Sequence, residues 1–136
     1  MTATQTPSDE YLDYFKGEGY VPQADNEGNI LFKREGLTYI LFTDHKDPNY
    51  FRLVCPIIWQ ISTEEQRVKA NQVISLVNLN VKAVKLFMVE NSVSASSESF
   101  LVYAEDYKPV LPRSLAALAF AVQTFASLMN SQTVTA

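Results

Sequence analysis

The fold follows most directly from one stretch near the middle of the chain, Leu37-Thr38-Tyr39-Ile40-Leu41-Phe42-Thr43. In an extended strand, successive side chains point to opposite faces, so Leu37, Tyr39 and Leu41 share one face. Ile40 and Phe42 then take the other face. Because both faces are apolar, the pattern predicts a strand inside a sheet, with cover on each side.

The residues around this strand predict two antiparallel neighbours. Arg34-Glu35-Gly36 is a tight-turn signal that joins a strand at 30–33 to the strand at 37–43. After it, residues 44–49 are dense in turn formers and lead into a strand at 50–55. The preceding stretch, 22–28, is polar and rich in turn residues, so it predicts a loop.

Capping signals and a second strand pair complete the expected order of elements. Thr6-Pro7-Ser8-Asp9 predicts a helix that ends at Gly17 and Gly19. Ser62-Thr63-Glu64-Glu65 predicts a second helix, in which Glu65 reaches back to the Ser62 amide, ending near 78–80. Strands at 81–89 and 92–103 follow. Serines at 92, 94, 96 and 97 make the start of the last strand polar, which predicts an exposed edge.

The predicted final helix, 111–129, carries no charged residue from Ser114 to the end of the sequence. One narrow apolar stripe is enough to dock it on the sheet. The apolar surface of this helix extends beyond that stripe, although an exposed helix face normally carries Lys, Glu or Arg. We therefore expect this zone to contact a second protein surface, unless loops or the N-terminal helix cover it within the monomer. The candidate interface residues are Phe120, Leu128, Ala117 and Ala121.

Length and charge limit the classes of function. A chain of 136 residues fits one domain, with an ordered core at about 6–130 and short flexible tails. Its net charge of -4 disfavours nucleic acid and anionic membranes as partners. The N-terminus lacks the pattern of a secretory signal, and the longest apolar run, 115–122, is too short to span a bilayer. The sequence therefore predicts a cytoplasmic protein.

The residues needed for catalysis or metal binding are scarce. The one histidine, His45, lies in a predicted surface turn, and the one cysteine, Cys55, lies in an apolar strand where a buried inert thiol is expected. Asp44, Asp47 and Asn49 lack the spacing of a calcium loop. The four glycines match no phosphate-binding motif. We expect no catalytic residue, no metal and no cofactor.

Three aromatic residues, Tyr39, Tyr50 and Trp59, could line a ligand pocket between sheet and helix. Aromatic residues in strands more often belong to the core. A pocket would favour a sensor of small molecules or peptides. A sensor of this kind is the alternative to a protein-interaction module.

The middle of the chain resembles the YbjN-like proteins, whose fold is similar to that of type III secretion chaperones. The resemblance rests on the stretches 36–44 and 47–54 and on single residues after them: Pro56, Trp59, Val77, Asn78, Lys82 and Lys85. It implies an α+β fold with an antiparallel five-stranded sheet flanked by helices, in the order α-β-β-β-α-β-β-α, often in a dimer. It implies no catalytic residue.

These observations together predict a non-enzymatic protein-interaction module, chaperone-like or regulatory, that acts as a homodimer. The contacts would come from the apolar surface around Phe120 and Leu128. The serine-rich strand edge could add contacts by pairing with a partner strand.

Overall fold

The structure is a computed structural model, and it describes residues 7–44 and 46–131. The predicted helix cap at Thr6, the predicted turn position of His45 and most of the predicted tails lie outside the described residues.

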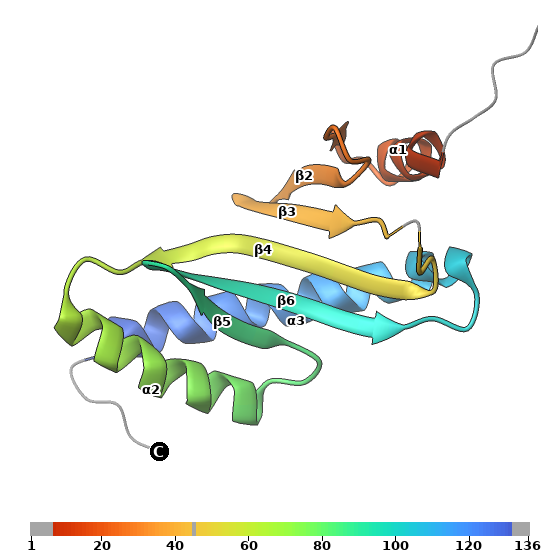
Figure 1. The fold of residues 1–136 in the computed structure, drawn as a ribbon. Coiled ribbons are helices and arrows are strands. Elements are labelled where there is room, and N and C mark those ends of the chain that lie inside the picture. The colour runs from red at the N-terminus through yellow and green to blue at the C-terminus, as the bar shows by residue number, and fades with distance from the viewer. Residues whose placement is uncertain (1–6, 45, 132–136) are drawn as a thin grey trace, which may run out of the picture.

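The described chain is an α+β fold built on a six-stranded antiparallel sheet in the order β1-β2-β3-β4-β6-β5 (Figure 1). The hairpins predicted from the sequence are present: β2 pairs with β3, and β3 pairs with β4. Along the chain the elements are α1 (Pro7–Gly17), β1 (Gln23–Ala24), β2 (Ile30–Arg34), β3 (Leu37–Phe42), β4 (Tyr50–Gln60), α2 (Glu64–Asn80), β5 (Lys85–Val89), β6 (Ser92–Phe100), the 3-10 turn η1 (Ala104–Asp106) and α3 (Tyr107–Met129).

The sheet has six strands where five were predicted. The additional strand, β1, is a two-residue strand inside the stretch predicted as a loop, and it pairs with β2 through Gln23 and Leu31. β4 is also longer than predicted, because it continues past Pro56. The register of β4 against β6 shifts between Cys55 and Trp59, and Ile57 adopts a positive φ of 51° there. A bulge of this kind lets a strand continue through a proline, which cannot donate to the ladder.

The serine-rich strand β6 lies inside the sheet, between β4 and β5, so the prediction that it forms an edge is wrong. Three of its serines, Ser94, Ser96 and Ser97, are buried, and their hydroxyls are hydrogen-bonded. The Ser97 hydroxyl donates to the Ala83 carbonyl at 2.8 Å, and the Ile57 amide donates to the Ser94 hydroxyl at 3.1 Å. A polar side chain is compatible with burial when it is bonded in this way, so polarity alone did not identify the edge. The edges are β1 and β5.

All three long helices pack on one face of the sheet. Phe15 of α1 lies 4.7 Å from the Phe32 ring of β2, and Phe125 of α3 lies 5.9 Å from the Trp59 ring of β4. The strand register places Phe32 and Trp59 on the same face as Tyr39 and its buried neighbours. The other face carries no helix in the described part of the chain, so the predicted cover on both sides of β3 is wrong. Alternating apolar residues show that both faces are apolar, but they do not show what covers them.

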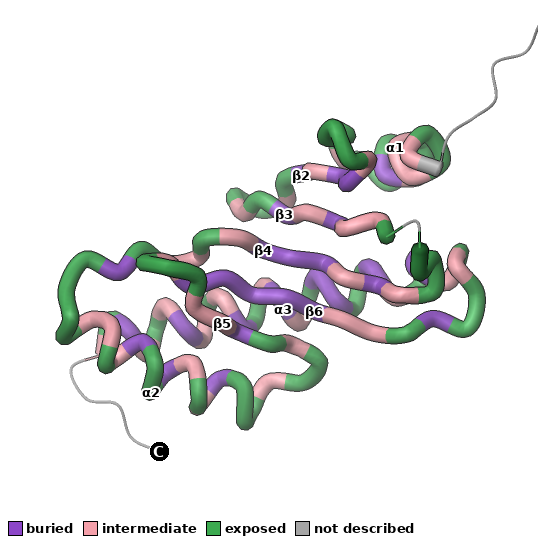
Figure 2. The backbone as a smooth tube through the Cα atoms, viewed as in Figure 1, coloured by how far each residue is buried: buried purple, intermediate pink, exposed green. Residues whose placement is uncertain are grey.

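Helix α3 forms one wall of the core (Figure 2). Its buried residues are Tyr107, Leu111, Ser114, Leu115, Leu118, Ala121, Phe125 and Met129. The segment Ala104–Met129 is the one described helix long and apolar enough to cross a membrane, by length and composition alone. The apolar run at 115–122, which was predicted from the sequence to be too short, is only part of this segment. The burial of its inner side against the sheet is what a core helix of a globular domain shows.

The cap of α2 lies one residue later than predicted. Thr63 is the N-cap, and its side chain accepts a hydrogen bond from the Gln66 amide at 3.1 Å. The Gln66 side chain in turn accepts from the Ser62 amide at 2.7 Å. Gln66 therefore has the capping role that was predicted for Glu65, because a Gln and a Glu side chain can each supply the accepting oxygen.

Candidate functional site

The face of the sheet opposite the helices is the candidate functional site, and we call it the open face. The strand register places one row of residues on it, in which Ile40 pairs with Leu31 and Val54, and Val54 pairs with Ser96. The solvated face of an antiparallel sheet is normally polar. Here it carries the apolar residues Leu31, Ile40, Phe42, Val54, Phe87 and Phe100.

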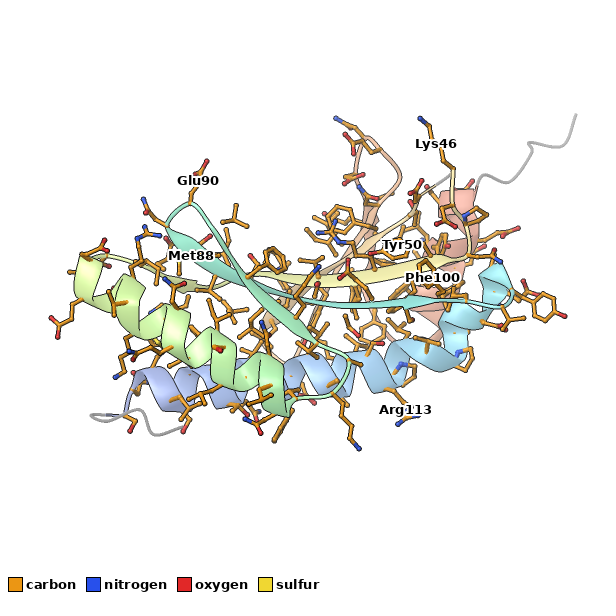
Figure 3. The ribbon with its side chains drawn as sticks, turned by 60° about the horizontal axis from the view of Figure 1, so that its bottom comes forward. Lys46, Tyr50, Met88, Glu90, Phe100 and Arg113 are labelled. Carbon is orange, nitrogen blue, oxygen red and sulfur yellow. The ribbon has the colours of Figure 1, made fainter. Side chains whose placement is uncertain are left out.

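The exposed end of this face is aromatic. Phe100 is 85% exposed at the end of β6, and its ring lies 5.9 Å from that of Tyr50 on β4. Figure 3 shows these two side chains together at the end of the sheet. An aromatic ring this exposed is unusual on a sheet face, and it offers a large apolar contact area.

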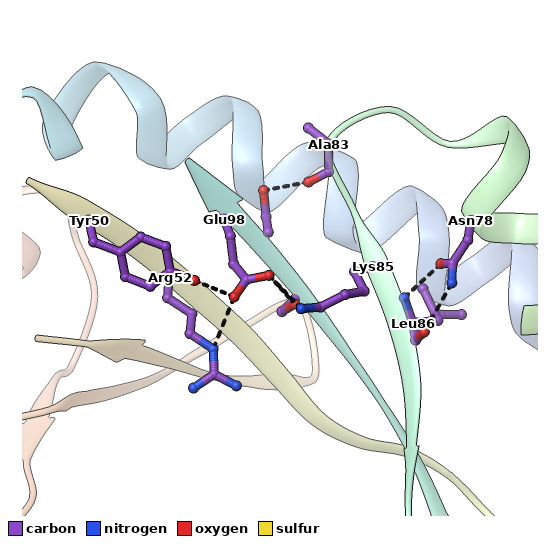
Figure 4. Close-up of polar contacts among 9 residues, drawn as sticks. Tyr50, Arg52, Asn78, Ala83, Lys85, Leu86 and Glu98 are labelled. Carbon is purple, nitrogen blue, oxygen red and sulfur yellow. Dashed lines mark hydrogen bonds and ion pairs between the residues drawn. The ribbon is translucent and has the colours of Figure 1, made fainter. Parts of the chain in front are cut away.

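A cluster of polar residues around Glu98 joins three strands on the open face (Figure 4). The Glu98 carboxylate lies 2.8 Å from Lys85 Nζ on β5 and 3.5 Å from Arg52 Nε on β4. The Tyr50 hydroxyl donates a hydrogen bond to the same carboxylate. The Arg52 guanidinium also lies over the Phe42 ring, 4.7 Å from its centre. The apolar and charged parts of the face are therefore in contact.

The electrostatics keep this cluster in one protonation state. Hydrogen bonds from Lys85 and then Tyr50 lower the pKa of Glu98, against the opposing effect of burial. Burial, and then the bond to Glu98, raise the pKa of Tyr50 to about 12. At neutral pH the carboxylate is therefore charged and the phenol neutral. With its partners already bonded, the cluster is suited to hold side chains in place, and not to transfer protons.

A shallow hollow of about 420 Å³ adjoins the cluster at the end of β3 and β4. Asn29 fixes its floor, since the Asn29 side chain accepts from the Thr43 amide at 2.9 Å and donates to Asp25 at 3.1 Å. Its size lies within the range of ligand pockets. The hollow is lined by Glu27, Asn29, Phe42, Thr43, Asp44, Lys46, Tyr50 and Arg52.

The three residues proposed from the sequence as a pocket do not come together. Tyr39 is fully buried on the face that the helices cover. Tyr50 lies on the open face, and Trp59 packs on Phe125 at the far end of β4. Tyr50 and Trp59 are nine positions apart along β4, which corresponds to about 30 Å. Sequence proximity grouped these residues, but the length of β4 separates them.

The four residues proposed as a helix interface differ in exposure. Phe120 is 60% exposed, whereas Ala121 is fully buried in the core and cannot contact a partner. Ala117 and Leu128 are half-buried, and Leu128 packs against the core. Phe120 is therefore the one large side chain of the four that is available on the surface.

A second exposed residue, Leu79 of α2, lies at the level of Phe120. The two helices are antiparallel (Figure 1), and the Lys69 ammonium donates to the Ser131 carbonyl. From this contact, Leu79 lies ten residues further along α2, and Ala121, the neighbour of Phe120, lies ten residues back along the chain. The two positions are at a similar level because both helices have the same rise per residue. Leu79 is 80% exposed. The two long helices α2 and α3 thus each carry one strongly exposed, large apolar side chain in this region.

The structure places the cysteine where it was expected. Cys55 is buried in β4, and burial raises the pKa of its thiol to about 11, so it is protonated at neutral pH. Within residues 7–44 and 46–131, no group of three or more His, Cys, Asp or Glu side chains is placed to hold a metal ion.

Comparison with known proteins gives one match in structure. No protein-family model matches the chain, and no curated protein sequence matches it. The crystal structure of YbjN, a candidate transcription regulator from E. coli, matches with a TM-score of 0.58, 11% identity and coverage of 89% of this chain and 92% of that chain. The chain therefore has a YbjN-like fold, as its sequence resemblance predicted. At this identity the likeness concerns the fold alone.

Proposed function

We propose that this protein is a non-enzymatic interaction module with a regulatory role, and that its open face binds a partner protein. One observation carries the proposal: a sheet face without a helix over it presents one exposed aromatic residue, Phe100, and four half-buried apolar residues beside a fixed ion cluster. A contiguous exposed apolar patch with polar surroundings is typical of a protein-binding surface.

The composition of the face favours a protein over a small ligand. Protein interfaces are enriched in aromatic residues and arginine, and the open face supplies Phe42, Phe100 and Arg52. The Glu98 carboxylate already holds Arg52 and Lys85. Less side-chain entropy is therefore lost when a partner contacts them. A chaperone-like role would use the same face, with an extended client segment as the partner.

A pair of substitutions tests this face. In Phe87→Asp combined with Phe100→Asp, two carboxylates replace rings on the open face, and we expect partner proteins captured from the host to be lost. The matched control combines Val21→Asp with Val68→Asp, because these valines are 86% and 52% exposed outside the open face. The measurement is quantitative affinity capture with all three forms. If both double variants retain the same proteins as the wild type, the proposal is wrong.

We further propose that the protein pairs with itself through the helix side. The outer side of α3 carries no charge after Arg113, and Phe120 and Leu79 are exposed at the same level. Sedimentation equilibrium should show a dimer for the wild type and a monomer for Phe120→Glu. Val89→Glu, at an exposed position of β5, is the control that should remain dimeric. A wild type that stays monomeric at high concentration excludes the homodimer.

A further inference from the structure

A second hollow, of about 700 Å³, lies between α1 and the start of α3. Three tyrosines, Tyr11, Tyr14 and Tyr107, line it, and we call it the tyrosine hollow. It belongs to different elements from the open face, whose residues come from β2 to β6. Its volume is within the range of sites that hold a ligand or a peptide side chain.

The tyrosine rings are held against one another. The Tyr11 and Tyr107 ring centres are 4.6 Å apart, and the Tyr14 and Tyr107 centres are 5.4 Å apart at nearly a right angle. Tyr107 is buried, whereas Tyr11 and Tyr14 are partly exposed. The hollow thus has a fixed aromatic wall with ring surface available to a ligand.

The rim of the hollow is acidic. Glu10 and Asp13 of α1 and Glu105 of η1 line it, and Lys108 is the one cationic residue in its lining within 7–44 and 46–131. The Lys108 ammonium lies 5.3 Å from the centre of the Tyr14 ring, so the chain's own cation already occupies one ring face. Among the described lining residues, the carboxylates of Glu10 and Glu105 alone outnumber the Lys108 ammonium, so this side of the hollow is negatively charged.

We propose that the tyrosine hollow binds an arginine or lysine side chain of a partner protein. Aromatic faces attract such cations through the ring quadrupole, and the surrounding carboxylates add charge attraction. A guanidinium can stack on a tyrosine ring while its N–H groups donate to Glu10 or Glu105. A neutral or acidic group would lose the charge attraction, so the hollow selects for a basic side chain.

This site is independent of the open face, and its test does not depend on the proposed function. The experiment is a ¹H–¹⁵N NMR titration of the full chain with N-acetyl-arginine methylamide. The probe for comparison is N-acetyl-citrulline methylamide, which has nearly the same shape without the charge. We expect the arginine compound, and not the citrulline compound, to shift the amide signals of Tyr11, Tyr14 and Tyr107.

Charge variants distinguish the hollow from the acidic surface in general. Glu10→Gln and Glu105→Gln should each weaken binding by about two- to five-fold, as expected for exposed charge pairs. Glu65→Gln removes the same charge at an exposed position of α2 and should leave the affinity unchanged. Tyr14→Leu keeps apolar bulk but removes the ring, and should weaken binding further. Equal shifts with citrulline, or equal losses in Glu65→Gln and Glu10→Gln, would overturn the proposal.

Discussion

Glu98 is the residue through which the open face is organised. Its carboxylate contacts Lys85 of β5, Arg52 and Tyr50 of β4, and so connects the strands on either side of its own. Its side chain is 24% exposed, so solvent screens the ion pairs less than at a fully exposed site. Loss of this one carboxylate would leave two cations close together on the same face.

Glu98→Gln should reduce the free energy of unfolding by about 1 kcal/mol at neutral pH. Because the folded pKa of Glu98 is lowered, its carboxylate stabilises the fold above the unfolded pKa of about 4.3. That contribution is lost as the pH falls through the folded pKa. Urea unfolding of the wild type and the variant at several pH values measures the difference. A difference that persists unchanged in acid would contradict this assignment, and Glu65→Gln serves as the exposed control.

This cluster could not be found from the sequence. Glu98 reaches Arg52 and Tyr50 because β6 also pairs with β4, whereas the polar serines of β6 indicated an edge. Phe120 behaved differently, since its exposure follows from the 100° spacing along one helix. Residue properties that depend on one element were predictable, whereas those that depend on the order of strands were not.

At the scale of elements, Asn78 covers the middle of the sheet edge formed by β5. Its side chain donates to the Leu86 carbonyl at 3.0 Å and accepts from the Leu86 amide at 2.7 Å (Figure 4). An unpaired sheet edge is open to association with another strand. The end of α2 therefore occupies the backbone groups that strand pairing by a partner would need, which argues against binding at this edge.

Asn78→Ala should lower the free energy of unfolding by about 1–2 kcal/mol, because two backbone groups lose their partner. It should also speed hydrogen exchange at the Leu86 amide. Asn80→Ala is the matched control, since the Asn80 side chain bonds only within its own helix, to the Leu76 carbonyl at 2.8 Å. If the Leu86 amide exchanges equally slowly in both variants, Asn78 does not cover this edge.

Substitutions at two neighbouring positions of α3 distinguish packing in the core from self-association. Ala121 is fully buried, so Ala121→Leu should overpack the core and reduce the free energy of unfolding by about 1–3 kcal/mol. Phe120→Glu, at an exposed position, should change the monomer's stability by only about 0.5 kcal/mol. Chemical denaturation at low protein concentration gives both values. A large loss in Phe120→Glu would show that this ring supports the monomer instead of the proposed dimer.

At the scale of the whole molecule, the sheet joins two groups of core residues. At one end Phe15 of α1 packs on Tyr20 and on Phe32 of β2. At the other end Phe125 of α3 packs on Trp59 of β4. Between them the fully buried strand residues Tyr39 and Leu53 continue the core across the sheet. The sequence predicted a single domain from length alone. The continuous core supplies a physical reason to expect that α1 and α3 unfold together.

Phe15→Leu and Phe125→Leu test this expectation from opposite ends. Each removes ring contacts at a fully buried position and should reduce the free energy of unfolding by about 1 kcal/mol. Trp59 fluorescence reports the end near α3, and far-UV circular dichroism reports all helices. If the core is one cooperative unit, both probes show the same urea midpoint in every form, and both variants lower it. A Phe15→Leu variant that shifts the dichroism midpoint but leaves the Trp59 midpoint unchanged would mean that α1 and its strands unfold separately. The open face would then span two units of different stability, and partner binding there would stabilise them to different extents.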